Sequence, residues 1–218
     1  MSKLNFSIDE LQDLVHQALR APLPGPRAHE PLRAKPLGPV VPKFNHAVPP
    51  RAGSVLLLLC PDSGIIRFPL IKRPEYQGLH SGQVSLPGGK AEPGESTIET
   101  ALREAREEIG VDPVKVKVLG TLSQFYVIPS NFMVTPVVAL AEAQPDYQPD
   151  AQEVVRILQG NVQELLADDA VRIKEIEVSG RYRMLAPHFE IEGEIVWGAT
   201  AMMLNEFRML LRECLGYE

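Results

Sequence analysis

The sequence contains little cysteine, few aromatic residues and no long apolar run. Two cysteines among 218 residues are too few for a disulfide-stapled fold, so we expect Cys60 and Cys214 to be buried free thiols. No apolar run approaches the roughly 18 residues of a membrane-spanning helix. The chain begins with the polar, amphipathic stretch MSKLNFSIDELQDL, which does not resemble a signal peptide. We therefore expect a cytoplasmic protein that does not bind membranes.

Clusters of basic residues are also missing. The formal net charge is −6 at pH 7, and an acidic chain of this kind is a poor binder of nucleic acid or of acidic membranes. Apolar residues make up 44% of the chain and charged residues 23%, which is ordinary for a folded domain. At this length the chain can bury a sizeable core, so length and composition agree with one compact domain.

A helix is predicted over residues 97–109 from the signals at its two ends. Ser96 and Glu99 have the spacing of a capping box at the helix start. Gly110 suits the left-handed residue that often ends a helix. Upstream, the strand candidate at 84–86 leads into a Pro-Gly-Gly loop, where bare backbone can approach a ligand closely. The predicted unit is strand, glycine loop and helix.

Three glutamates share one face of this predicted helix. Their spacing of i, i+3 and i+4 brings the side chains together, and they are Glu104, Glu107 and Glu108. A narrow apolar stripe lies on another face and consists of Ile98, Leu102, Ala105 and Ile109. We expect the stripe to pack and the carboxylates to be free for chemistry. A solvated surface helix is the alternative, since like-charge pairs there cost only about 0.2–0.5 kcal/mol each.

The segment from Gly89 to Val111, GKAEPGESTIETALREAREEIGV, resembles the Nudix box of the Nudix hydrolases. Every fixed position of that pattern agrees, and of its two bulky aliphatic positions Val111 fits while Ala105 is smaller. The resemblance implies an α/β fold of the Nudix type, an α/β/α sandwich with a mixed sheet. It also implies hydrolysis of a nucleoside diphosphate linked to another group, with Mg²⁺ or Mn²⁺ as cofactor. Clustered carboxylates without nearby cysteine or histidine suit such hard cations.

The resemblance also assigns roles by position. Glu104, Glu107 and Glu108 would be metal ligands together with the Gly89 carbonyl. Arg103 would orient Glu104, and Glu95 would fix the loop. The catalytic residues would thus be Glu104, Arg103 and Glu95. Glu104 is the first choice for the general base, and Glu153 is the alternative.

A second motif narrows the substrate. The run LIKRPEYQGLHSGQVSLPGG resembles the signature of the coenzyme A pyrophosphatases within the Nudix family. The positions in register are Arg73, Gly82, Pro87, Gly88 and Gly89, and the departures are Pro74, Gly78 and Leu86. Gly78 replaces an arginine, which removes a bidentate phosphate contact. The resemblance implies cleavage of coenzyme A or acyl-coenzyme A to 4′-phosphopantetheine and adenosine 3′,5′-bisphosphate.

Two other functions stay open. One is a Nudix pyrophosphatase of another nucleotide, such as ADP-ribose or a dinucleotide, which the missing arginine favours. The other is a noncatalytic nucleotide-ligand sensor, which loss of a box carboxylate would favour, although all are present here. The sequence does not decide between a monomer and a homodimer.

Several single residues have both a functional and a structural interpretation. The substrate-binding candidates are Lys72, Arg73, His80, Gly88 and Gly89. Lys72 and Arg73 could equally form a solvated strand edge, and His80 could be structural. Phe125 and Tyr126 could stack on an adenine, although core packing is the preferred interpretation. Trp197 is predicted to be a core anchor where a strand leads into the last helix.

The chain is predicted to have two parts. Residues 1–52 would form a helix over 7–20 and then an extended strap packed on the domain, because nine prolines in 21–52 exclude regular helix or central strand. Residues 53–218 would form the hydrolase domain. Its expected strands lie near 54–60, 65–72, 83–86, 114–122, 132–142, 174–178, 181–185, 188–192 and 194–197, with helices near 97–109, 160–167 and 199–214.

Overall fold

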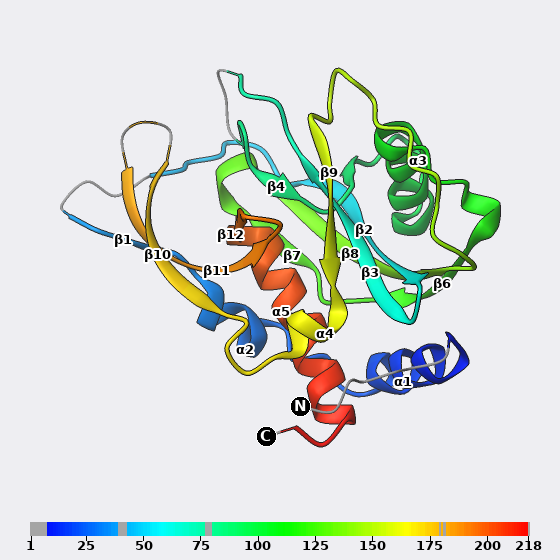
Figure 1. Ribbon diagram of the computed structural model, residues 1–218. Coiled ribbons are helices and arrows are strands. Elements are labelled where there is room, and N and C mark those ends of the chain that lie inside the picture. Colours follow the sequence, from blue (N-terminus) through cyan, green and yellow to red (C-terminus); the bar gives the residue numbers. More distant parts are fainter. Residues whose placement is uncertain (1–7, 39–42, 77–79, 179, 181, 218) are drawn as a thin grey trace.

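A mixed β-sheet between helices organises the computed structural model, which describes residues 8–38, 43–76, 80–178, 180 and 182–217. Helix α3 packs on β2 and β8 from one side, and α5 lies on the opposite side with α1 and α2 against it (Figure 1). This arrangement confirms the predicted α/β/α sandwich with a mixed sheet.

The main sheet has the strand order β4-β3-β2-β8-β6. Strands β2 and β8 run parallel, whereas the other pairs are antiparallel. Short strands β5 and β7 pair with β2 and β8, and β9 pairs with β3. The strands are β2 (Arg51–Asp62), β3 (Ile65–Lys72), β4 (Val84–Ser85), β5 (Gly88–Lys90), β6 (Val116–Thr121), β7 (Phe125–Val127), β8 (Phe132–Ala141) and β9 (Arg156–Asn161).

A smaller sheet joins the chain's N-terminal segment to its C-terminal third. Strand β11 lies between β1 and β10 and also pairs with β12. The two strands predicted at 181–185 and 188–192 form one long strand, β11, because Pro187 does not interrupt its pairing with β10. The strands are β1 (Lys35–Pro36), β10 (Arg172–Val178), β11 (Tyr182–Ile191) and β12 (Glu194–Trp197).

The helices agree closely with the sequence prediction. The proline-rich segment is not uniformly extended, because it forms α2, a 3₁₀ turn and β1. The predicted boundary between residues 52 and 53 falls inside β2, and the two-part division stays a prediction. The helices are α1 (Ile8–Arg20), α2 (Pro26–His29), α3 (Thr97–Ile109), α4 (Val162–Leu166) and α5 (Gly198–Cys214), with 3₁₀ turns η1 (Glu30–Leu32), η2 (Pro113–Lys115) and η3 (Ile128–Ser130).

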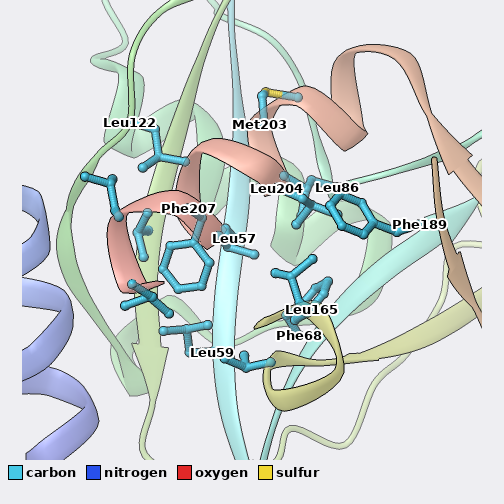
Figure 2. Close-up of a cluster of buried hydrophobic side chains, with 14 of the residues drawn as sticks. Leu57, Leu59, Phe68, Leu86, Leu122, Leu165, Phe189, Met203, Leu204 and Phe207 are labelled. Carbon is cyan, nitrogen blue, oxygen red and sulfur yellow. The ribbon is translucent and has the colours of Figure 1, made fainter. Parts of the chain in front are cut away.

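Alternation along β2 divides the core into two layers. Leu57 and Leu59 point to the α5 side, where they join Phe68 and Phe207 (Figure 2). Leu56, Leu58 and Cys60 point to the α3 side. Burial of each such leucine stabilises the fold by about 1.5–3 kcal/mol. Because side chains alternate along a strand, this pattern identifies which residues of β2 face the glutamate-bearing helix.

Both cysteines are free, but only Cys60 is buried, while Cys214 is half-buried. The expectation of two buried thiols is therefore wrong for Cys214. Within the described ranges, no helix combines the length and the apolar character needed to cross a membrane.

Candidate active site

The helix α3 has the limits that its end signals predicted. The Ser96 hydroxyl accepts a hydrogen bond from the Glu99 amide at 3.2 Å, and the Glu99 carboxylate accepts one from the Ser96 amide at 2.8 Å. Gly110 ends the helix with φ 72°, where glycine avoids the strain that a side chain would cause. The capping box therefore fixes where the carboxylates stand along the helix.

One of the three carboxylates lies on the packed face of α3. Glu108 is only 1% exposed and lies with the fully buried Ala105 and Ile109, whereas Ile98 is 39% exposed. The expectation that the apolar stripe packs and all three carboxylates stay free is wrong for Ile98 and Glu108. The cause is the glycine loop, whose polar backbone packs on α3 and offers Glu108 a buried partner.

Gly88 supplies that partner. Its amide donates to the Glu108 carboxylate at 2.7 Å, and Arg73 Nη2 lies 3.5 Å from the other carboxylate oxygen. Burial outweighs both contacts and raises the pKa of Glu108 to about 7. Gly88 has φ 149°, and a Cβ there would stand 2.3 Å from the Ser54 carbonyl oxygen. Only glycine fits this approach of loop to strand.

Gly89 makes the same kind of approach to Glu104. A Cβ on Gly89 would lie 2.5 Å from Glu104 Oε2, so the missing side chain leaves the space for this carboxylate. Burial raises the pKa of Glu104, although a hydrogen bond from Arg103 opposes the shift. The charge of Glu153 also raises the pKa of both Glu104 and Glu108. Glu153 thus interacts electrostatically with Glu104 and Glu108, which together with Glu107 form the carboxylate cluster.

Arg103 links the loop to the cluster. Its Nε donates to Glu95 at 2.6 Å, and its Nη1 donates to both Glu104 and Glu107 at 2.9 Å. The Glu95 hydrogen bond is the main reason that the pKa of Arg103 is raised. In return, Arg103 lowers the pKa of Glu95 to about 2. The Glu107 side chain is 59% exposed, so it forms the solvent edge of the cluster.

Ser54 is a site residue that the sequence analysis did not single out. It lies directly opposite Gly89 in the β2–β5 pair, so it shares the face on which Gly89 approaches Glu104. Ser54 is 1% exposed, and its hydroxyl has no hydrogen-bond partner among the described residues. The sequence did offer one indication of its burial, because Ser54 lies two residues before Leu56, and therefore on the same face, in an otherwise apolar strand.

The donor set fits a hard divalent cation in its chemistry. It offers carboxylate oxygens, an unpartnered buried hydroxyl at Ser54 and the space beside Gly89. Across the described part of the chain, no three His, Cys, Asp or Glu side chains converge as a ready metal site. Arg103 Nη1 donates to both Glu104 and Glu107 and so bridges these two carboxylates.

The two adjacent basic candidates at the end of β3, Lys72 and Arg73, point in opposite directions. Arg73 reaches Glu108, the Gly88 carbonyl at 3.4 Å and the Ser85 hydroxyl at 3.2 Å. Lys72 lies on the same face of β3 as Leu70 and Phe68, which pack in the α5-side core. Its Nζ donates to Glu194 at 2.8 Å. The position of Lys72 therefore does not support a contact with an anion bound at the carboxylates.

His80 is half-buried and its Nδ1 lies 3.0 Å from Gln83 Oε1, so the structure connects it to its own loop rather than to the carboxylates. Gly78, the position of the missing arginine, lies outside the described residues.

The aromatic candidates separate between the two faces of the sheet. Phe125 packs against the α5-side core, as preferred. Tyr126 pairs with Met133 across β7 and β8, which places it on the α3 side, and it is 37% exposed. Core packing is therefore the wrong interpretation for Tyr126. Trp197 stands at the β12–α5 junction as predicted but is only half-buried.

Comparison with known proteins identifies the family of this chain. The profile of the NUDIX domain matches residues 50–178. An uncharacterized Nudix hydrolase NudL from Pectobacterium atrosepticum is 35% identical over 146 residues, covering 66% of this chain and 74% of the relative. The protein of the same name from Yersinia pestis is 32% identical over 158 residues, covering 71% and 76%.

Among solved structures, a MutT protein from Methanosarcina mazei aligns with 79% of this chain and 97% of its own, at 19% identity and a TM-score of 0.48. The family profile covers more than half of the chain, and the NudL relatives match over two thirds of their own length. The chain belongs to the Nudix hydrolase family.

Proposed function

We propose that the chain is a metal-dependent pyrophosphohydrolase whose substrate is coenzyme A or an acyl-coenzyme A. Members of the family act on nucleoside diphosphates linked to another group. The observation that carries the catalytic part is the contact of the Gly88-Gly89 loop with two carboxylates of α3. Gly88 donates to Glu108 at 2.7 Å, and Gly89 leaves the space that Glu104 occupies.

The proposed ligands of Mg²⁺ or Mn²⁺ are Glu104, Glu107, Glu108 and the Gly89 carbonyl. When bound, such an ion polarises phosphate oxygens and lowers the pKa of bound water. Arg103 bonds Glu95 and Glu104 together, and it would therefore hold Glu104 in a fixed orientation. Glu95 would fix the loop, since it also accepts hydrogen bonds from the Thr100 hydroxyl and the Glu92 amide.

The general base in this proposal is Glu104, which would accept a proton from the attacking water. The hydrogen bond from Arg103 and the close approach of Gly89 to this carboxylate support the role. Glu153 is the alternative, because it is exposed on the segment before β9 and is coupled to the same carboxylates.

The coenzyme A part of the proposal rests on the segment that runs from Arg73 to Gly89. The Arg73 side chain connects this segment to the cluster through Ser85, Gly88 and Glu108. Tyr126, exposed on the α3 side of the sheet, offers a ring on which an adenine could stack. His80 and Lys72 stay weaker candidates for substrate contacts.

Gly78 favours one competing function. An arginine there would bind phosphate, and its replacement suits a substrate without the additional phosphate of coenzyme A, such as ADP-ribose or a dinucleotide. The test is product analysis by mass spectrometry after incubation with coenzyme A, acyl-coenzyme A, ADP-ribose, NADH and diadenosine polyphosphates. Adenosine 3′,5′-bisphosphate and 4′-phosphopantetheine as the fastest-formed products support the proposal. Preferential cleavage of ADP-ribose contradicts its substrate part.

A matched control separates this activity from a contaminant. Glu108→Gln removes one charged oxygen from the cluster and keeps the size of the side chain. Product formation that persists at the same rate in this variant would contradict the proposed site. Absence of turnover with every substrate, in a folded protein with Mg²⁺ or Mn²⁺, would favour the noncatalytic sensor.

A further inference from the structure

Arg73 contacts Glu108, a carboxylate that Arg103 does not contact within the described residues. It follows the last residue of β3, and its parity matches Ile71, which packs on the α3 side. Its Nε donates to the Ser85 hydroxyl at 3.2 Å, so β4 supports the guanidinium. Nη2 then lies 3.4 Å from the Gly88 carbonyl and 3.5 Å from Glu108 Oε1. One side chain thus touches the loop and the buried carboxylate together.

Glu108 needs a counter-charge because it is almost fully buried. Its side chain is 1% exposed, and a buried carboxylate without a partner is strongly unfavourable. Within the described residues, the Glu108 carboxylate contacts the Arg73 guanidinium and the Gly88 amide. The neighbouring charges of Glu104 and Glu153 repel it. Arg73 is therefore the cation that compensates Glu108 in this protein.

The contacts of Arg73 with Glu108 and Gly88 are long for charge-assisted hydrogen bonds, which are usually about 2.7–2.9 Å. Arg103 shows the contrast, because its contacts with Glu104 and Glu107 are 2.9 Å each. Arg73 is also 28% exposed. The guanidinium is held by Ser85 but only loosely by Glu108, so another cation at Glu108 could displace it at small cost.

We propose that Arg73 is a positioning residue that neutralises Glu108 in the metal-free protein and is released toward the substrate's phosphates when a divalent cation takes over Glu108. This inference rests on the proposed function, because it takes Glu108 as a metal ligand. It changes the interpretation of Arg73 from a permanent substrate contact to one that becomes free only in the loaded site. It also explains why Arg73, a residue of the motif that resembles the coenzyme A pyrophosphatase signature, contacts the carboxylate cluster.

The test is a double-mutant cycle read by thermal melts, with Arg73→Met, Glu108→Gln and the double variant, in EDTA and again with saturating Mn²⁺. In EDTA at alkaline pH, Arg73→Met should lower Tm by at least about 5 °C. Glu108→Gln should recover most of that loss, because the uncompensated charge is gone. Mn²⁺ should raise the Tm of Arg73→Met more than that of the wild type, since the ion replaces the lost cation.

Lys72→Met is the matched control, because Lys72 adjoins Arg73 but faces the other side of the sheet and pairs with Glu194. Its loss in Tm should be unaffected by Glu108→Gln and by Mn²⁺. If Arg73→Met does not fold, Arg73→Lys, which keeps the charge and loses the guanidinium fork, serves in the same cycle with a smaller loss.

Two results would overturn the inference. The first is additivity of Arg73→Met and Glu108→Gln in EDTA, which would show that the two side chains do not compensate each other. The second is an equal rise in Tm with Mn²⁺ for wild type and Arg73→Met. Failure of the proposed function is distinguishable, because it would appear as no Mn²⁺ shift and no hydrolysis in wild type while the cycle in EDTA still reports the pairing.

Discussion

His29 Nε2 lies 2.9 Å from Glu206 Oε2, and the side chains are 6% and 0% exposed. The other oxygen of Glu206 accepts hydrogen bonds from the Gly25 amide at 3.2 Å and the Ser123 amide at 3.3 Å. Burial alone would raise the pKa of Glu206, but the hydrogen bonds, of which that from His29 is the largest contribution, hold it below its usual range. One carboxylate on α5 thus fastens the N-terminal segment and the β6–β7 connection.

Replacing His29 by Ala should lower the free energy of unfolding by about 3 kcal/mol, because it leaves Glu206 buried without its main partner. Urea denaturation monitored by circular dichroism measures this loss. Arg27→Ala is the matched control on the same segment, since the Arg27–Glu213 pair is 66% and 49% exposed and should contribute less than about 1 kcal/mol. Equal effects of the two substitutions would contradict the buried-hub interpretation.

The same carboxylate should make stability depend on pH. The folded-state pKa of Glu206 is below its unfolded value, so its stabilisation is complete above the unfolded pKa and is lost as the pH falls through the folded pKa. Glu206→Gln should flatten the decline of stability in the acid range. An unchanged acid limb in this variant would count against the assignment.

Glu107 and Glu108 should both be needed for turnover. Replacing either by Gln removes a charged oxygen from the proposed metal shell, and we expect kcat to fall by at least about a hundredfold at saturating Mg²⁺. Glu99→Gln lies on the same helix within the capping box and should change kcat only within a few fold. Steady-state rates of Glu107→Gln and Glu108→Gln close to wild type would remove the metal-ligand assignment.

Without metal, Glu108 should destabilise the protein at neutral and alkaline pH. Its folded-state pKa is raised to about 7, above the unfolded value, so the stability present below the unfolded pKa is lost as the pH rises through about 7. In EDTA, Glu108→Gln should therefore melt at least about 2 °C above wild type at alkaline pH, with the difference shrinking in acid. A clear drop in Tm would identify the cluster as a structural ion-pair hub instead.

Local signals predicted the parts of the site that depend on neighbours in the chain. The capping box and Gly110 located α3 because helix ends are fixed by residues within one turn. The burial of Glu108 was not predictable from the helix alone, because it depends on a glycine loop that packs on α3 from 20 residues away. The apolar pattern of a helix predicts its packed face from hydrophobicity alone, so it could not show that a buried amide, that of Gly88, would bind Glu108.

Strand parity decided the difference between Lys72 and Arg73. Leu70 and Ile71 pack in opposite core layers. Because side chains alternate along a strand, the side chains of the next two residues, Lys72 and Arg73, also point to opposite faces of the sheet. Knowing which face one residue of β3 occupies is enough to infer this. Strand β9 was missed altogether. In its pairing with β3, Arg156 lies opposite Lys72, which is far away in the sequence. A six-residue segment alone gives little indication of a strand that depends on such long-range pairing.

The two loop glycines should respond differently to an added methyl group. Gly89→Ala would place Cβ against the flexible end of Glu104 at 2.5 Å, so the protein should fold while kcat falls by at least about tenfold. Gly88→Ala would meet the Ser54 carbonyl at 2.3 Å and the Val55 Cα at 2.5 Å. Because backbone cannot move aside cheaply, this variant should lose stability first. Thermal melts paired with steady-state rates separate the two, and a destabilised Gly89→Ala with normal kcat would contradict the prediction.

Restoring an arginine at residue 78 should improve coenzyme A binding without changing the chemistry. A phosphate contact away from the metal acts equally on ground and transition states, so Gly78→Arg should lower KM for coenzyme A and leave kcat nearly unchanged. Gly78→Gln is the matched control, because it adds a long polar side chain without the charge. Kinetics with coenzyme A and ADP-ribose in competition provide the measurement. If the folded arginine variant gains nothing for coenzyme A and the wild type prefers ADP-ribose, the coenzyme A assignment must be abandoned, whereas membership of the Nudix hydrolases is unaffected.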